Sequence, residues 1–114
     1  MLSDIDRASL SSILFNIDLA NHFVDGFDYH RFLMDMRTFY ATTRCLEIIS
    51  EASRRLSPGL KARHPEIPWR QVAGAGNVYR HDYEDVVHRL VWGTVHSFLP
   101  ALRAVAEAEL PTRC

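Results

Sequence analysis

The chain has 114 residues, a length that fits one domain with a modest hydrophobic core. A hydrophobic share of 47% and a charged share of 24% are typical of a folded globular chain, and a net charge of −1 excludes a global attraction to nucleic acid or anionic membranes. An anionic partner must therefore be bound by a local basic patch. The two cysteines make no disulfide framework, and no stretch of about 18 apolar residues occurs, so we expect a soluble cytoplasmic protein.

The spacing of apolar residues predicts a first helix that begins at Ser3 or Asp4 and stops at Gly26. Asp28 is placed to cap a second helix, and no Gly or Pro follows until Pro58. Apolar residues keep a three-four spacing through this whole segment, which predicts one helix of about 29 residues and roughly 43 Å. A helix of this length needs partners along most of its surface, so the pattern favours a bundle.

Prolines and acidic residues divide the second half of the chain. Three prolines limit the segment "SPGLKARHPEIP" to one short helical turn, and Pro68 suits the first position of the helix "PWRQVAGAGNVYR". Glu84 lies where acids favour a helix start, and Pro100 predicts a kink or a break in the final helix. No segment has the alternation of a strand. The sequence therefore predicts an all-α, antiparallel bundle of four to five helices in a single domain over 1–114.

The segment "GAGNVYRHDY", residues 74–83, concentrates the side chains with chemical potential. A histidine titrates near neutral pH and serves as a general acid or base, which makes His81 the leading catalytic candidate. Structural readings stay open: His81 also suits the negative end of a helix, and Asn77 suits a helix C-cap. The glycines match neither the phosphate-loop nor the dinucleotide-binding pattern, and no strand precedes them.

A metal site is a weaker interpretation of the same region. Asp85 and His88 are three residues apart on one helical face, with Asp82 nearby, but the set lacks a strong ligand spacing. We therefore expect neither a metal nor a cofactor. The basic run "KARH" at 61–64 is read as a solvated loop in preference to an RNA-binding patch, and Cys45 as a small packed side chain.

From about residue 28 to the end, the chain resembles the HepT-like branch of the HEPN superfamily. Three stretches carry the resemblance: "LEIISEASRRL", with Glu51 at an acidic position, then "HPEIPWRQVAGAGNVYRHDY", then "VVHRLVWGTVHSFLPALRAV". The resemblance implies a small helical bundle that acts as a toxin ribonuclease. It also implies a homodimer whose two motifs face a shared cleft.

The resemblance assigns roles to four positions of the motif. Asn77 takes the place of the family's asparagine, His81 that of its histidine and Tyr83 that of its tyrosine, while the arginine position falls on Gly76. The implied partner is a minimal nucleotidyltransferase antitoxin, as in type VII toxin–antitoxin systems, and Tyr83 is the implied acceptor of AMP. A nucleotide on Tyr83 adds negative charge against incoming phosphates, which explains how it silences the enzyme.

The glycine at position 76 leaves two functions open. Arginine stays charged and binds two phosphate oxygens at once, and glycine supplies neither property. Arg80 lies four residues later, one turn along the same helical face, and is the candidate replacement. One hypothesis is therefore a metal-independent endoribonuclease that uses His81, Asn77 and Arg80. The alternative is a catalytically impaired protein of the same fold that serves as a binding partner of the nucleotidyltransferase.

Overall fold

The computed structural model describes the backbone of residues 2–81 and 84–111, and their side chains except those of 77–81 and 84–85. Helices dominate this part of the chain and no strand occurs in it, which confirms the predicted all-α class. The elements in chain order are α1 (Asp4–Val24), α2 (Tyr29–Met34), α3 (Met36–Arg54), α4 (Pro58–Arg63), α5 (Trp69–His81), α6 (Glu84–Gly93), the π-helical turn η1 (Thr94–Phe98) and α7 (Leu99–Glu109).

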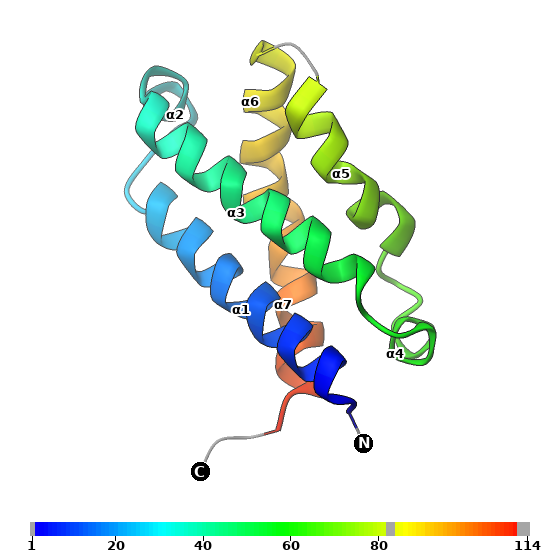
Figure 1. The fold of residues 1–114 in the computed structure, drawn as a ribbon. Helices are drawn as coiled ribbons and strands as arrows, with labels where there is room; N and C mark the ends of the chain where they lie inside the picture. The colour runs from blue at the N-terminus through cyan, green and yellow to red at the C-terminus, as the bar shows by residue number, and fades with distance from the viewer. Residues whose placement is uncertain (1, 82–83, 112–114) are drawn as a thin grey trace.

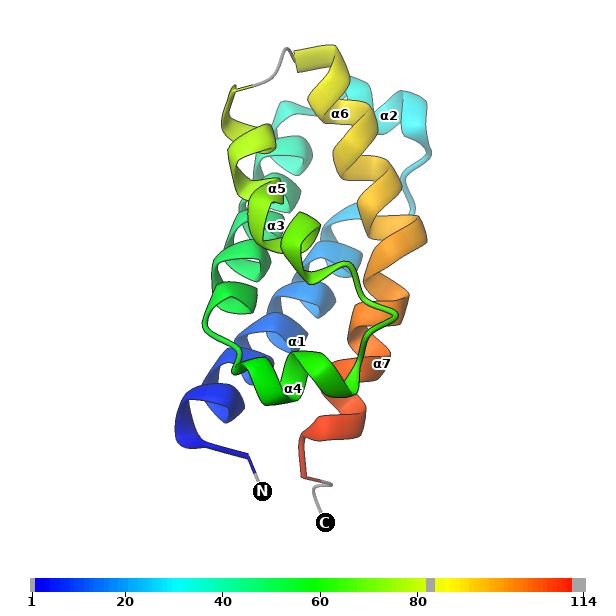
Figure 2. The same cartoon turned by 90° about the vertical axis from the view of Figure 1, so that its right-hand side faces the viewer.

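The helices form a bundle in which the longest two, α1 and α3, lie side by side (Figure 1). Helix α5 packs on α3, while α6, η1 and α7 together make one long rod that passes beside α1 (Figure 2). The start of α1, the short α4 and the end of α7 lie at one end of the bundle. The end of α5 and the start of α6 lie at the opposite end, so the chain turns there at the motif (Figures 1 and 2).

Helix α1 begins and ends at the residues that the sequence predicted. The Ser3 hydroxyl accepts a hydrogen bond from the Asp6 N–H at 3.0 Å, which satisfies one of the free donors of the first turn. Gly26, with φ of +78°, follows the end of the helix in a left-handed conformation that glycine adopts without strain. The two signals fix the length of α1 at 21 residues.

The predicted single helix from Asp28 onward is wrong, because the chain breaks it at Asp35. Asp28 caps α2 as expected, with its carboxylate accepting from the Arg31 N–H at 2.8 Å. Asp35 then caps α3, accepting from the Thr38 N–H at 3.0 Å, and its own backbone is extended. A short aspartate side chain competes with the helix for backbone donors, so a second cap ends one helix and starts another without Gly or Pro.

Pro58 and Pro68 both lie at the start of a helix as predicted, but α5 begins one residue later than expected. Pro58 opens the six-residue α4, and the Ser57 hydroxyl caps it from the preceding position. Pro68 stands one residue before α5 and supplies the carbonyl that accepts from the Val72 N–H at 3.0 Å. Proline fixes its own φ angle, and Pro68 therefore restrains the backbone directly before the first residue of α5.

The break expected near Pro100 is confirmed and takes the form of a π-helical turn. Pro100 lies in the first turn of α7, where a missing N–H costs nothing. The preceding five residues widen into η1, and the Leu99 N–H bonds the Thr94 carbonyl five residues back. One inserted π turn lets the rod continue past a proline that an uninterrupted α-helix would not tolerate.

One hydrophobic core runs through the bundle. Its buried members come from all the helices, and Val72 at 8% exposure belongs to it from the described side chains of α5. The largest buried side chains are Phe32, Leu10, Ile13, Ile17, Leu60, Leu99, Leu102 and Val91. Cys45 is buried among them and burial raises the pKa of its thiol, so it packs as the small apolar group that was predicted.

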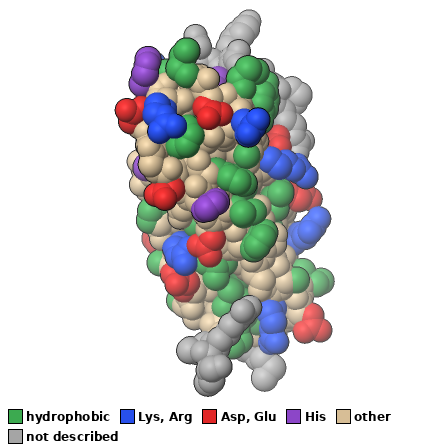
Figure 3. Space-filling view, turned by 90° about the vertical axis from the view of Figure 1, so that its left-hand side faces the viewer, with side chains coloured by type: hydrophobic (Ala, Val, Ile, Leu, Met, Phe, Trp, Pro, Cys, Tyr) green, Lys and Arg blue, Asp and Glu red, His purple; other side chains and the backbone are tan. Residues whose placement is uncertain are grey.

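The surface carries charges of both signs close together. On the face at the left of Figure 1, acidic and basic side chains alternate with apolar ones and form no single basic field (Figure 3). Within the described residues, no helix is long and apolar enough to cross a membrane.

Candidate active site

Helix α5 carries the motif, and its first turn is fixed by Trp69. The indole Nε1–H points at two backbone carbonyls, those of Lys61 at 3.1 Å and His64 at 3.0 Å. A half-buried tryptophan with its N–H satisfied is a rigid anchor. The helix then runs without interruption from Trp69 to His81 along one side of α3.

The predicted catalytic positions fall on the far end of α5. Asn77 and Arg80 lie in its last two turns and His81 is its last residue, with their side chains outside the described part of the structure. Tyr83 lies outside the described residues altogether. Because α5 is continuous here, position 80 follows position 76 by one turn, or about 6 Å along the axis.

Gly76, at the position where the resemblance expects an arginine, lies at a contact between α5 and α3. Gly76 is buried, and its N–H donates to the Ser50 hydroxyl at 3.2 Å. A Cβ at position 76 would lie 3.3 Å from the same oxygen, tighter than an ordinary contact. The Ser50 hydroxyl in turn donates to the Ala73 carbonyl at 3.0 Å. A serine of α3 thus leaves a side chain at position 76 little room to begin.

Arg54, one turn after Ser50, is a second link from α3 to the same helix. Its Nε and Nη2 donate to the Ala73 carbonyl at 2.9 and 2.6 Å, and its Nη1 donates to Glu51 at 3.2 Å. Glu51 also lies 3.6 Å from Arg55. The acidic position of the "LEIISEASRRL" stretch therefore pairs with two arginines, of which Arg54 contacts α5. Sequence reasoning missed Ser50 and Arg54, although their four-residue spacing puts both on one helical face.

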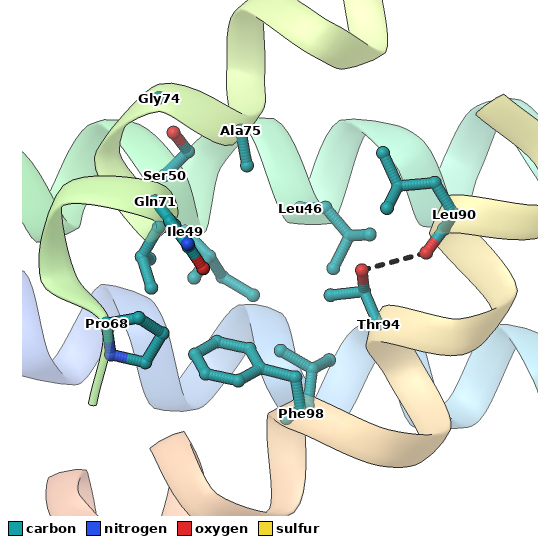
Figure 4. A pocket seen from close by; sticks show the side chains of 12 residues that line it. Leu46, Ile49, Ser50, Pro68, Gln71, Gly74, Ala75, Leu90, Thr94 and Phe98 are labelled. Atoms are coloured by element: carbon teal, nitrogen blue, oxygen red, sulfur yellow. Dashed lines mark hydrogen bonds between the residues drawn. The ribbon is translucent and has the colours of Figure 1, made fainter. Parts of the chain in front are cut away.

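A mostly apolar groove of about 570 Å³ opens between α3, α5 and the α6–η1 rod. Figure 4 shows Leu46 and Ile49 of α3 at its base, with Leu90 of α6 and Phe98 of η1 on the side away from α5. The groove continues over α6 and η1 into a second depression that shares Leu90, Thr94 and Phe98 with the first. The two depressions thus form one continuous hollow beside α6 and η1, and its first part is lined mainly by apolar side chains.

Of the three residues in the metal interpretation, only His88 has a described side chain. No group of three or more His, Cys, Asp or Glu side chains comes together among them. The side chains of Asp82 and Asp85 lie outside the described part of the chain. His88 is buried, with its ring stacked 3.7 Å from the ring of Phe39 and edge-on to Phe32. Such surroundings are those of a packed aromatic ring in the core.

The "KARH" run is neither a solvated loop nor an open basic patch. It forms the end of α4, and Arg63 and His64 both reach Glu109 at the end of α7, at 2.8 and 2.5 Å. These two partners hold the pKa of the Glu109 carboxyl at about 2, with Arg63 the larger influence. The cluster ties α4 to the end of the chain, far from the motif (Figure 2).

The structure thus defines a class, a small all-α bundle with a polar motif where its fifth helix ends. Comparisons with known proteins narrow this class. A family model described as "Ribonuclease HepT-like" matches residues 13–109. The protein named "Probable ribonuclease HepT" of Thermococcus cleftensis is 38% identical over 98 residues, which cover 86% of this chain and 89% of the relative.

A second relative, named "Putative RNase MJ1380", of Methanocaldococcus jannaschii, is 31% identical over 101 residues, covering 89% of this chain and 93% of the relative. No solved structure matches the chain. A match over most of the chain, together with relatives of nearly equal length, places it plainly: the chain belongs to the ribonuclease HepT-like family.

Proposed function

We propose that this chain is a metal-independent endoribonuclease that acts as a homodimer and forms the toxin component of a HepT-type toxin–antitoxin system. The family match over residues 13–109 carries the proposal, because it spans the whole motif. The relatives named as ribonucleases support the reaction class. The end of α5 supports the site, because it brings positions 77, 80 and 81 to one end of the bundle.

The proposed reaction needs proton transfer and charge stabilisation. The ribose 2′-oxygen attacks the neighbouring phosphorus as its proton passes to a base, and the bond from phosphorus to the 5′-oxygen breaks as that oxygen gains a proton. His81 serves as one of these proton carriers, since an imidazole titrates near neutral pH. Asn77 donates hydrogen bonds to the phosphate, and Arg80 supplies the positive charge that Gly76 lacks.

The homodimer places two motifs in one cleft, and the face between α5 and α6 is the surface we propose for it. Val86 and Leu90 of α6 are large apolar side chains with 55% and 38% exposure. They flank the groove, and their helix starts directly after the motif. Burying such a face against a second copy removes apolar area from water and sets the two α5 ends close together. Two weak basic regions then add up in one cleft.

The proposed partner is a minimal nucleotidyltransferase that modifies Tyr83. The tyrosine oxygen bonds to the α-phosphorus of ATP, pyrophosphate leaves, and AMP remains on the side chain. The added phosphate repels RNA and its nucleoside fills the cleft. Intact-mass measurement after incubation with ATP and the nucleotidyltransferase is expected to show one AMP adduct. A Tyr83→Phe variant that is still modified would overturn this assignment.

The primary experiment measures RNA cleavage by the purified chain and by His81→Ala on single-stranded and structured RNA. Loss of at least tenfold in rate is expected, because general acid–base catalysis typically contributes 10²–10⁴-fold. Arg80→Gln is expected to lose activity too, since it removes the proposed phosphate contact. A rate that His81→Ala leaves unchanged would contradict the proposal.

The Gly76 contact favours a second candidate, a binding protein of this fold that has lost cleavage. Its N–H is bonded to Ser50, and a Cβ at this position would lie in tight contact with the Ser50 oxygen. On this reading the chain keeps the dimer and the contact with the nucleotidyltransferase. Expression in cells separates the two: a native chain that stops growth supports the nuclease, and a native chain that is harmless beside a toxic Gly76→Arg, Ser50→Ala double variant supports the binding protein.

A further inference from the structure

Two glycines on α5, two residues apart, meet different surroundings. A Cβ built on Gly74 has nothing within 4 Å, whereas one built on Gly76 lies 3.3 Å from the Ser50 oxygen and 3.7 Å from the Ser50 Cβ. Both glycines have ordinary helical backbones, since neither has a positive φ. The absence of a side chain at position 76 therefore has a local cause that the absence at position 74 lacks.

The cause is a hydroxyl that makes two hydrogen bonds to α5. Ser50 is 2% exposed, and its oxygen accepts from the Gly76 N–H and donates to the Ala73 carbonyl. Arg54 donates to the same carbonyl from the solvent side. A buried hydroxyl with both functions satisfied is a fixed point, because moving it leaves polar groups unpaired. A side chain at position 76 would press on it, because its Cβ would lie 3.3 Å from the Ser50 oxygen.

We propose that Ser50 is the positioning residue of the motif helix, and that Ser50 and Gly76 are two halves of one contact. The hydroxyl of α3 holds α5 at Gly76, the position where the resemblance expects an arginine. A side chain introduced at position 76 is therefore accommodated more readily when the Ser50 hydroxyl is removed as well. The importance of this contact for RNA cleavage rests on the proposed function, but the contact itself does not.

The Ser50–Gly76 contact lies close to the motif, and one continuous helix joins the two. Gly76 precedes His81 by five residues, about 7.5 Å along a continuous helix. The other anchor of α5, the Trp69 indole, lies two turns earlier, at the start of the helix. Ser50 and Arg54 are therefore the fixed points nearest the motif among the described contacts of α5. Releasing Ser50 leaves the last turns of α5 free to shift relative to α3.

Thermal unfolding of single and double variants tests the contact without any assay of activity. Gly74→Ala is expected to raise the Tm by about 2–4 °C, because alanine favours a helix and meets open space. Gly76→Ala is expected to gain nothing or to lower the Tm, because its Cβ pushes on Ser50. In a Ser50→Ala background, Gly76→Ala is expected to recover the gain of about 2–4 °C, because the opposing oxygen is gone.

Ser53 supplies a matched control on the same helix. Its hydroxyl is buried and donates to the Ser50 carbonyl at 2.7 Å, within α3 itself. Gly76→Ala is expected to behave in a Ser53→Ala background as it does in the native chain. Equal Tm shifts for Gly74→Ala and Gly76→Ala in all three backgrounds would overturn the proposal.

RNA cleavage then tests the consequence for the site. Ser50→Ala is expected to lower kcat at least threefold with KM within twofold, whereas Ser53→Ala leaves kcat within twofold. Gly76→Arg combined with Ser50→Ala is expected to cleave at least tenfold faster than Gly76→Arg alone. Equal rates for these last two enzymes, or equal kcat for the two serine variants, would overturn the positioning role.

The Tm measurements and the cleavage rates together distinguish a failure of the Ser50 proposal from a failure of the proposed nuclease function. Coupling in Tm with no cleavage by any variant would support the contact and reject the proposed nuclease. Cleavage by the native chain with no coupling in Tm would support the nuclease and reject Ser50 as the positioning residue.

Discussion

Helices α1 and α3 meet along their whole length, whereas α5 and α6 meet at one end and diverge into a groove. The first pair buries Leu10, Ile13 and Ile17 of α1 to 1% exposure or less. The second pair leaves Val86 and Leu90 exposed beside the groove. The first pair thus contributes fully buried side chains to the core, whereas the second pair borders the groove that we propose as the dimer surface. Mutations on the two sides should separate stability from association.

The largest expected effect lies on the closed side. Ile13→Ala removes a fully buried side chain between α1 and its neighbours and is expected to cost about 2–5 kcal/mol of the free energy of unfolding. Chemical denaturation with an unchanged m-value measures it. A loss below about 1 kcal/mol would mean that the α1–α3 contact is far looser than its burial indicates. Ile5, with 65% exposure on the same helix, is the matched control, and Ile5→Ala is expected to change stability by less than about 0.5 kcal/mol.

A smaller effect is expected where the closed side is joined to α4. The buried Asp6 carboxylate accepts from the Ser57 N–H at 2.8 Å and from its hydroxyl at 2.6 Å. Asp6→Ala leaves both donors without this partner and is expected to cost about 1–3 kcal/mol. Asp4→Ala, two residues earlier on the exposed surface, serves as the control. Equal stability of the two variants would show that the Asp6–Ser57 bonds add nothing.

A pH-dependent effect of a few degrees in Tm is expected at the end of α7. Arg63 and His64 hold the pKa of Glu109 at about 2, below its usual value of 4.5, so the folded chain binds this proton less tightly than the unfolded chain does. The contribution is therefore complete above pH 4.5 and disappears as the pH falls toward 2. The Tm difference between the native chain and Glu109→Gln should shrink over that range by about 1–3 °C, since the pair lies at the surface. Glu107→Gln should show no such trend.

The smallest effect on stability is expected on the open side, with the clearest effect on assembly. Leu90→Ser changes a side chain with 38% exposure at the groove and is expected to alter the free energy of unfolding of one chain by less than about 1 kcal/mol. The proposed dimer should dissociate at least tenfold more readily, as measured by sedimentation equilibrium. Phe15→Ser, on the outer face of α1 with 63% exposure, should leave the association unchanged. Equal dimer dissociation constants for Leu90→Ser and Phe15→Ser would show that the interface does not lie at the groove.

Local signals in the sequence were enough to predict most of the elements. The caps at Ser3 and Asp28, the turn at Gly26 and the break before Pro100 each depend on one residue and its immediate neighbours. The break at Asp35 was missed because the apolar spacing continues through it in phase, while the aspartate cap changes only the direction of the backbone. The spacing of apolar residues alone therefore cannot tell one long helix from two helices joined at Asp35.

The candidate site could be predicted only in part, for a different reason. The positions of Asn77, Arg80 and His81 on one helix follow from spacing, whereas the roles proposed for them rest on the resemblance and on chemistry. The Ser50–Gly76 contact joins residues 26 apart in sequence and depends on how α5 approaches α3. Helix approach is decided by packing over many residues, which no short motif records. The partners of Glu109 were missed for the same reason.

The π turn at Thr94–Phe98 has a consequence for how the chain tolerates insertions and deletions. It accommodates one residue more than an α-helical turn, so everything after it is rotated by about 100° relative to an unbroken rod. That phase step lets Val91 of α6 and Leu99 and Leu102 of α7 all face the core. Deleting one residue within 94–98 would straighten the rod but misalign its two halves. Length, as much as composition, is thus under constraint at this point of the chain.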